Sequence, residues 1–337
     1  MEMTTWLPVA WFAVIGFGVL MYVLLDGFVL GIGILAPFAH SEDALDQMMN
    51  TAAPIWDGNE TWLVLGGAGL LAAFPKAYSA LLSALYLPVL LLVMALVFRG
   101  VAFEFRFKAH RSRRLWSVAF AVGSVLATFA QGVILGALVQ GLDIVEGVYQ
   151  GGAFGWLSAF ALVTGIALVA GYALLGSTWL LLKTNGPVQA LARKMTRPLV
   201  VAVIVAMGVV SCWLPFLQSR LMARWFSDGN FWWLSPVPLL TLGVAFALWR
   251  SAIHPKRDLP PFLLSMALFV LGFVGLVLGM WPYLLPPTMT LWDAAAPASS
   301  LGFSLVGLVM LLPVILGYTA WSYRVFRGKV EAGAGYH

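Results

Sequence analysis

Residues 8–36 read PVAWFAVIGFGVLMYVLLDGFVLGIGILA, and this stretch contains a single charged residue, Asp26. A helix that crosses the hydrocarbon core of a membrane needs about 20 mostly apolar residues, so this run is long enough to cross with some tilt. The whole chain has the same character. Of its 337 residues, 61% are hydrophobic and 10% are charged, whereas soluble domains carry about 25% charged residues. So few charges cannot cover a water-exposed surface of this size, and the sequence predicts an integral membrane protein.

Nine apolar stretches predict nine transmembrane helices in an all-α, polytopic bundle. We expect one transmembrane domain over residues 1–337 and no soluble domain. The second stretch is short for a full crossing, and the longest loop, at about 37–59, precedes it. The predicted helices cover residues 8–36, 60–75, 79–103, 115–140, 153–182, 198–217, 235–252, 261–282 and 299–323.

Positive charge is concentrated on one side of this predicted bundle. If nine helices alternate in direction, all 19 lysines and arginines except Lys76, Arg220 and Arg224 lie on the same side. Short loops rich in Lys and Arg stay in the cytoplasm. The pattern therefore predicts an N-terminus outside the cell and a cytoplasmic C-terminus. It also argues against nucleic-acid binding, because the basic residues follow membrane topology.

The histidines and the cysteine narrow the kinds of site that this chain can form. All four histidines fall outside the predicted spans, whereas membrane haem proteins usually hold iron with histidines from helix interiors. We therefore expect the chain to hold no haem through histidine. The single cysteine, Cys212, cannot form a disulfide or a metal-binding cluster within the chain. The histidines are His40, His110, His254 and His337.

Asp26 is the most conspicuous charge, because it lies inside the first apolar run. A carboxylate at the centre of a spanning helix costs about 2.5–3.5 kcal/mol on insertion scales. Such a residue must face the protein interior, a partner or water. We expect Asp26 to serve a proton pathway; the alternative is a hydrogen-bonded or protonated acid that holds helices together.

The densest polar stretch is PIWDGNETW, residues 54–62, directly before the second predicted helix. The spacing of Asp57 and Glu60 fits a helix N-cap with its reciprocal acid. Both acids also suit the positive end of a helix dipole. The other interpretation is that these acids, with Asn59 between them, collect protons at the cytoplasmic mouth of the bundle. The spacing leaves both interpretations open.

Arg99 and Glu104 lie near the cytoplasmic end of the third predicted helix. Arg99 could extend its charged end toward the membrane interface. It could also pair with Glu104 or with an acid from another helix. We predict a structural ion pair between Arg99 and Glu104.

Three segments in this order and spacing resemble subunit II of the cytochrome bd-type quinol oxidases, including the shorter cyanide-insensitive type. They are DGFVLGIG at 26–33, WDGNETW at 56–62 and FRGVAFEFR at 98–106. The resemblance extends along the whole chain but is strong only up to about residue 110. One position departs from it: Val29 stands where many relatives carry a second acid, so no proton role of that acid carries over.

The resemblance implies a complex of the bacterial cytoplasmic membrane that oxidises quinol on the outer side and reduces dioxygen to water. It implies a partner, subunit I, that holds haem b and haem d (or a b-type substitute), while this chain holds none. A small single-helix subunit and membrane lipid are further expected partners. Asp57 matches an acid on a proton route from the cytoplasm, Trp62 matches an aromatic residue near an oxygen route, and Asp26 matches the acid of the first helix. With Glu60 and Asn59, these acids form the predicted proton pathway.

Two other functions fit the same residues. A secondary transporter also places acids at helix breaks near the middle of the membrane. A purely structural membrane scaffold would use the acids only to cap helices and to form ion pairs.

Overall fold

The computed structural model describes residues 3–227, 229–254, 257–331 and 333. Most of these residues are helical, and eight helices are long and apolar enough to cross a membrane within this described part of the chain. Two short β-hairpins, β1–β2 and β3–β4, lie between helices. The elements are α1 (Met3–Leu35), η1 (Ala36–Phe38), α2 (Glu42–Asn50), α3 (Trp56–Ala73), α4 (Pro75–Lys108), α5 (Arg113–Gln140), β1 (Ile144–Val145), β2 (Val148–Tyr149), α6 (Ala159–Lys183), α7 (Gly186–Leu217), α8 (Ser219–Phe226), α9 (Asn230–Leu234), α10 (Pro236–Ser251), α11 (Leu259–Met280), β3 (Tyr283–Leu285), β4 (Met289–Thr290), α12 (Leu291–Ala294) and α13 (Ala298–Val325).

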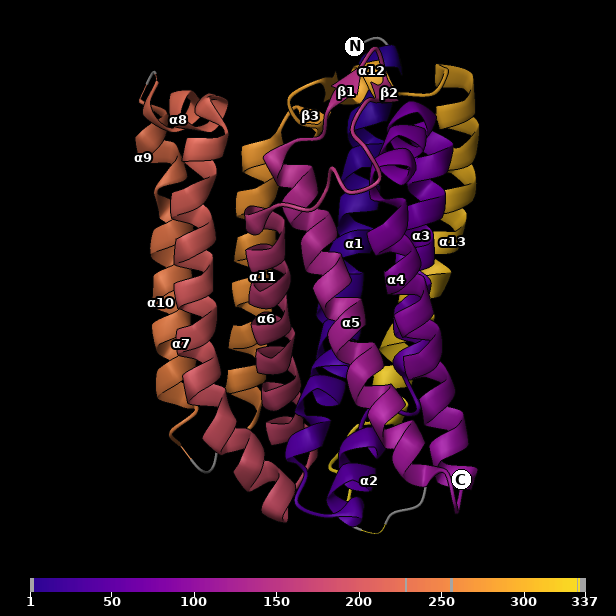
Figure 1. The fold of residues 1–337 in the computed structure, drawn as a ribbon, viewed down its shortest axis with the longest axis vertical. Helices are drawn as coiled ribbons and strands as arrows, with labels where there is room; N and C mark the ends of the chain where they lie inside the picture. Colours follow the sequence, from indigo (N-terminus) through magenta and orange to yellow (C-terminus); the bar gives the residue numbers. More distant parts are fainter. Residues whose placement is uncertain (1–2, 228, 255–256, 332, 334–337) are drawn as a thin grey trace.

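The helix bundle confirms the predicted all-α membrane architecture, while the predicted count of nine spans is not confirmed, because α3 is not among the eight candidates. The polar first turns of α3 lower its average hydropathy. Its 18 residues nevertheless rise about 27 Å. Its last residue, Ala73, accepts a hydrogen bond from the amide of Ala296. The nearby Trp292 in α12 donates to the carbonyl of Thr5 in α1, so α3 ends where α1 begins (Figure 1).

Several helices begin or end away from their predicted boundaries. The helix predicted from 198 begins at Gly186, so the basic residues at 193–197 lie on α7 instead of in a loop. The helix predicted from 153 begins at Ala159, where the Ser158 side chain caps α6. The predicted loop 37–59 contains η1, α2 and the first residues of α3. Hydropathy identifies the lipid-crossing part of a helix, and it misses polar turns that continue the helix into the interface.

α1 and α6 pack closely enough that only glycine fits between them. A Cβ atom on Gly31 of α1 would lie 1.9 Å from the carbonyl oxygen of Tyr172 in α6. α5 and α6 meet in the same way, since a Cβ on Gly132 would lie 2.6 Å from the Cα of Gly165. Small residues allow such backbone contact between membrane helices. α1 is thereby fixed at the centre of the bundle, among α3, α5 and α6 (Figure 1).

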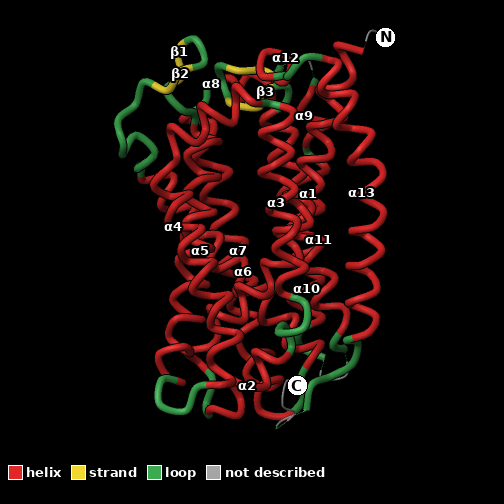
Figure 2. The backbone as a smooth tube through the Cα atoms, turned by 90° about the vertical axis from the view of Figure 1, so that its right-hand side faces the viewer, coloured by secondary structure: helices red, strands yellow, loops and turns green. Residues whose placement is uncertain are grey.

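Burial separates the central helix from the peripheral ones. In its most apolar window, α1 is 72% buried, whereas α7 and α13 are each 11% buried. α7 and α10 form a pair at one side of the bundle, and α13 runs along another edge (Figures 1 and 2). Their outward side chains are apolar, including Phe246 on α10 and Phe303 on α13. Such faces fit lipid or another membrane subunit.

Candidate functional site

The interior of the bundle holds a buried arginine between two carboxylates. Nη2 of Arg99 on α4 lies 2.8 and 2.7 Å from the two carboxylate oxygens of Asp26 on α1. The same nitrogen lies 2.9 Å from Oε1 of Glu60 on α3. The side chains of Arg99 and Asp26 are fully buried, and that of Glu60 is 29% exposed. Three helices therefore bring one positive and two negative groups together in the membrane region.

Two glycines position Arg99. A Cβ on Gly123 of α5 would lie 2.8 Å from the carbonyl oxygen of Ala95 and 3.1 Å from the amide of Arg99. A Cβ on Gly100 would lie 3.0 Å from the Trp56 ring. The guanidinium of Arg99 lies 5.6 Å from the centre of that ring, within range of a cation–π interaction. Close packing against α5 and α3 thus holds the arginine toward α1.

The hydrogen bonding of Arg99 is incomplete. Its Nε and Nη1 atoms are buried and have no hydrogen-bond partner among the described residues. Buried donors of this kind are normally satisfied, often by ordered water. The charges do not balance either, because two carboxylates face one guanidinium. This arrangement can accept a proton without burying an additional net charge.

A polar chain continues from Asp26 into the bundle. Tyr22 lies one helical turn before Asp26 on α1, and the Gln131 amide donates to the Tyr22 oxygen at 3.0 Å. The Tyr172 hydroxyl in turn donates to Oε1 of Gln131 at 2.9 Å. These contacts join α1, α5 and α6. Single Tyr and Gln residues in apolar runs give no signal of pairing, so these contacts could not be predicted from the sequence.

Asn59 and Asp57 lie on different sides of the first turns of α3. Asn59 is buried, donates to the Leu25 carbonyl at 2.9 Å and accepts from the Tyr323 hydroxyl at 3.0 Å. Asp57 is exposed, and its Oδ1 accepts from the Gly58 amide at 2.7 Å. A crevice lined by both residues lies between α3 and α13. The predicted proton-pathway residues are therefore neighbours, with Asp57 at the surface and Asp26 inside.

The cap interpretation of Asp57 and Glu60 and the predicted Arg99–Glu104 ion pair are both wrong. Asp57 and Glu60 form no reciprocal cap, because Ile55 precedes α3 as its N-cap and Glu60 points to Arg99. Arg99 does not pair with Glu104, which is 55% exposed and lies 3.5 Å from Lys108. Five residues rotate a helix by about 140° beyond a full turn, so positions 99 and 104 face different directions. The alternative that Arg99 pairs with acids of other helices is confirmed.

Trp62, predicted near an oxygen route, is fully buried one turn beyond Asn59. Its ring packs edge-on against Phe17 of α1 at 5.7 Å between centroids. Its Nε1 atom has no hydrogen-bond partner among the described residues. An indole donor is usually paired when buried, so this position is unusual for a residue that serves packing alone.

A second buried arginine, Arg106, was missed by the sequence analysis. Its Nη2 lies 2.7 Å from Oε2 of Glu42, its Nη1 pairs with Asp46, and its Nε donates to Ser117 at 2.8 Å. Arg113 of α5 also pairs with Asp46. Burial raises the pKa of Asp46, but the hydrogen bonds from Arg113 and Arg106 outweigh it and bring the pKa below its ordinary value of 3.8. This network fastens α2 to α4 and α5.

The histidines that the structure describes belong to no grouping that would hold a metal ion. His40, His110 and His254 lie outside the helices, as predicted, and His337 lies outside the described residues. Within the described part of the chain, no group of three or more His, Cys, Asp or Glu side chains is placed to hold a metal ion.

The chain is similar to known respiratory proteins. It is 27% identical to the cytochrome bd-I ubiquinol oxidase subunit 2 of Escherichia coli (strain K12), over 95% of this chain and 94% of that protein. It is 29% identical to the cytochrome bd ubiquinol oxidase subunit 2 of Bacillus subtilis (strain 168), over 95% of this chain and 96% of that protein.

A solved structure supports the same assignment at the level of the fold. A chain of the bd oxidase from Geobacillus thermodenitrificans matches with a TM-score of 0.80 and 15% identity, covering 95% of this chain and 98% of that chain. The family model for cytochrome bd terminal oxidase subunit II matches residues 7–326. These matches favour the oxidase over the secondary transporter that the sequence left open. The chain thus belongs to the cytochrome bd terminal oxidase subunit II family and is a multi-pass subunit of a bd-type quinol oxidase, an oxidoreductase complex that also contains subunit I.

Proposed function

We propose that this haem-free chain conducts protons from the cytoplasm into the oxidase complex, through Asp57, Asn59, Glu60 and Asp26. The observation that carries the proposal is the buried Arg99 cluster, in which two carboxylates share one guanidinium and the Nε and Nη1 donors have no hydrogen-bond partner in the described part of the chain. A structural ion pair needs balanced charge and complete hydrogen bonding to offset the cost of its burial. The Arg99 cluster has neither.

The path begins at Asp57, which is exposed beside the crevice between α3 and α13. Glu60 follows one helical turn along α3, partly exposed and next to Arg99. A proton on Glu60 neutralises the surplus negative charge, and Arg99 then remains paired with Asp26. The Tyr22, Gln131 and Tyr172 chain supplies hydrogen-bonding groups beyond Asp26.

The proposal includes an orientation in a bacterial cytoplasmic membrane. With α3 counted as a crossing, nine helices alternate and the start of α1 lies outside. The basic residues support this orientation, because only Lys76, Arg220 and Arg224 belong to the opposite end. The α2 end then faces the cytoplasm, where Asp57 collects protons. Haems b and d (or a b-type substitute) belong to subunit I in this proposal, and a small single-helix subunit stays a prediction.

Proton uptake from this side gives the reaction an electrical consequence. Dioxygen reduction to water consumes protons as well as electrons, and quinol oxidation on the outer side releases protons. Protons drawn from the cytoplasm through this chain therefore leave a membrane potential without a pump. The role of this chain's residues is to hold and pass the proton at the Glu60 and Asp26 carboxylates.

Replacing Glu60 by Gln tests the proposal directly. Glu60→Gln keeps the shape and removes the group that takes up the proton, so we expect oxygen consumption by the assembled complex to fall by about tenfold or more. Asp57→Asn should also slow turnover, by less, because water can reach Glu60 without it. Oxygen consumption is measured together with the haem absorbance spectrum, which reports assembly.

Glu104→Gln is the matched control, because it also removes an acid near the cytoplasmic end of the bundle. Glu104 is exposed and lies on a different face of α4 from Arg99. It should leave turnover unchanged. Normal turnover in an assembled Glu60→Gln complex would refute the proton role. Lower thermal stability with normal turnover would instead support the structural scaffold.

We further propose that Trp62 lines a route for dioxygen within the bundle. Its full burial, its contact with Phe17 and its unpaired Nε1 support a position beside apolar space instead of a hydrogen-bonded core. Trp62→Phe shortens the side chain and should change the KM for dioxygen with little change in the maximal rate at saturating oxygen. An unchanged KM with a reduced maximal rate would contradict this role.

A further inference from the structure

A groove on the surface between α7 and α10 combines positive charge with an apolar wall. Its volume is about 730 Å3. It lies at the basic end of the bundle, away from the Arg99 cluster. The groove is lined by Ala190, Arg193, Lys194, Arg197, Pro198, Val201, Trp249, Ala252 and Ile253.

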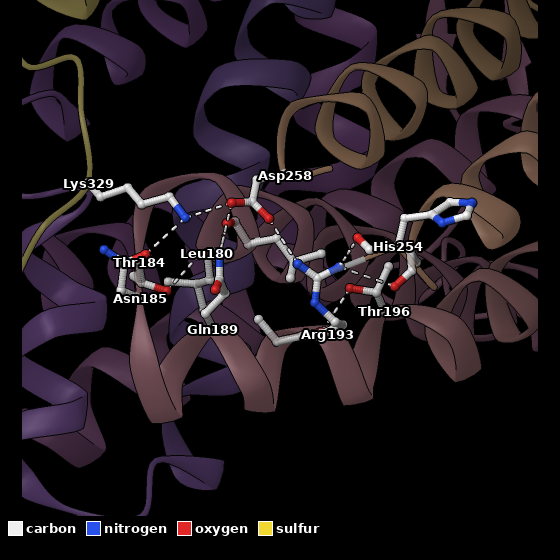
Figure 3. A network of polar contacts seen from close by, with 12 residues as sticks. Leu180, Thr184, Asn185, Gln189, Arg193, Thr196, His254, Asp258 and Lys329 are labelled. Carbon is white, nitrogen blue, oxygen red and sulfur yellow. Dashed lines mark hydrogen bonds and ion pairs between the residues drawn. The ribbon is translucent and has the colours of Figure 1, made fainter. Parts of the chain in front are cut away.

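One of the three cations in the groove, Arg193, is paired with an acid and is held in a fixed position. Arg193 Nη2 lies 2.9 Å from Asp258 Oδ1, and its Nη1 donates to the carbonyl oxygens of Ala252 and His254. Asp258 also accepts from Lys329 of the C-terminal segment (Figure 3). The loop between α10 and α11 is thereby fastened to α7, which holds the two sides of the groove in place.

The other two cations have no acidic partner in the described part of the chain. Lys194 is exposed, and no ion pair involves it or Arg197. Arg197 stacks on Trp249, with 4.1 Å from its Cζ to the ring centre, and its Nε is buried without a hydrogen-bond partner. Stacking uses the face of the guanidinium and leaves its N–H edge available for a phosphate.

The groove lies where the hydrocarbon core should begin. The apolar residues 199–217 follow the cations on α7 and rise about 28 Å, close to the thickness of that core. Trp249 stands near the end of α10, a usual place for an interfacial tryptophan. Further along α7, toward the middle of the membrane, the wall continues through Val201, which is 54% exposed. A ligand at this depth meets cations at one end and apolar side chains at the other.

We propose that this groove binds an anionic glycerophospholipid, with the phosphate at Lys194 and Arg197 and an acyl chain along Val201. Basic pockets between membrane helices on the cytoplasmic side suit such head groups. A free phosphate ion would satisfy the cations but leave the apolar wall unused. The lipid joins α7 and α10, the pair that stands at the side of the bundle (Figure 1).

The test uses the purified oxidase complex, delipidated in detergent and then mixed with dioleoyl phosphatidylglycerol, dioleoyl phosphatidylcholine or inorganic phosphate. Native mass spectrometry counts the lipids that stay bound. Lys194→Gln with Arg197→Gln should weaken the tightest phosphatidylglycerol binding by about tenfold or more, because two charges near the surface are removed. Lys194→Gln alone, at an exposed side chain, should give a smaller loss with no effect on folding.

The control is Arg111→Gln with Arg114→Gln, which removes two exposed charges at the same end of the bundle and outside the groove. This variant should retain the tight phosphatidylglycerol binding. Equal retention of phosphatidylcholine, equal losses in both double variants, or displacement of the lipid by millimolar inorganic phosphate would each overturn the proposal.

Discussion

Arg99 and Arg106 lie two turns apart on α4, and both are fully buried, yet their surroundings differ. Arg106 uses all three of its nitrogens, and the network around it contains two arginines and two acids. Arg99 uses one nitrogen for two acids, while its Nε and Nη1 have no hydrogen-bond partner among the residues that the structure describes. Within the described residues, Nε of Arg113 is the one nitrogen of the two arginines in the Arg106 network that is buried without a hydrogen bond, and it lies 3.6 Å from Oε2 of Glu42. A neutral network around an arginine whose own hydrogen bonding is complete stabilises one arrangement of helices, whereas the charge-unbalanced Arg99 cluster can change its protonation.

Access to water separates the two clusters as well. Around Arg106, the side chains of Glu42 and Asp46 are 58% and 24% exposed. Around Arg99, Asp26 is fully buried and Glu60 is 29% exposed. Water can therefore compensate a lost charge at Arg106, while a lost charge at Arg99 leaves Asp26 without any compensation.

The largest expected effect is that of Arg99→Met. Removing one partner of a buried ion pair leaves an uncompensated charge and typically costs about 3–5 kcal/mol. We expect little assembled complex in membranes and a strongly lowered unfolding temperature, measured by thermal unfolding of the purified complex. Arg99→Met combined with Asp26→Asn should recover much of this loss, because the fully buried carboxylate is then removed and the remaining acid, Glu60, is 29% exposed. Equal instability of the single and double variants would show that the two residues do not act as a pair.

Arg106→Met should have a smaller effect, about 1–3 kcal/mol, because its acidic partners reach water and surface ion pairs contribute little. The loss should appear as weaker docking of α2, measured by hydrogen exchange of residues 42–50. Oxygen consumption per assembled complex should stay normal. A drop in turnover as large as that of Glu60→Gln would contradict a purely structural role of Arg106.

Acid should weaken the Arg106 network in a defined pH window. The pKa of Asp46 is lowered in the folded chain, so its stabilising contribution is fully present above the unfolded pKa of about 3.9 and is lost as the pH falls through the folded value. The difference in unfolding temperature between wild type and Asp46→Asn should be constant from pH 5 to 7 and should shrink below about pH 4. A difference that persists unchanged at lower pH would contradict the role of Asp46 as the ionised partner.

The sequence predicted the elements of the site better than their pairing. Asp26, Asp57, Glu60 and Arg99 stood out because charge inside or beside an apolar run is costly. Arg99 and Asp26 are 73 residues apart in the chain, and no local spacing reports that contact. Glu104, the nearer acid, was chosen wrongly because proximity in sequence does not imply a shared helix face.

Composition and hydropathy alone determined that this is a helical membrane protein and where most of its helices lie. Each spanning segment must itself be apolar and form its own backbone hydrogen bonds in lipid, so its sequence is sufficient to identify it. The sequence motifs also indicated the family. Tertiary structure decided which charges meet, which arginine has complete hydrogen bonding and that α7 extends into a basic groove. Those features depend on helix rotation and on backbone contacts such as those at Gly31 and Gly123, which arise only when separate helices pack together.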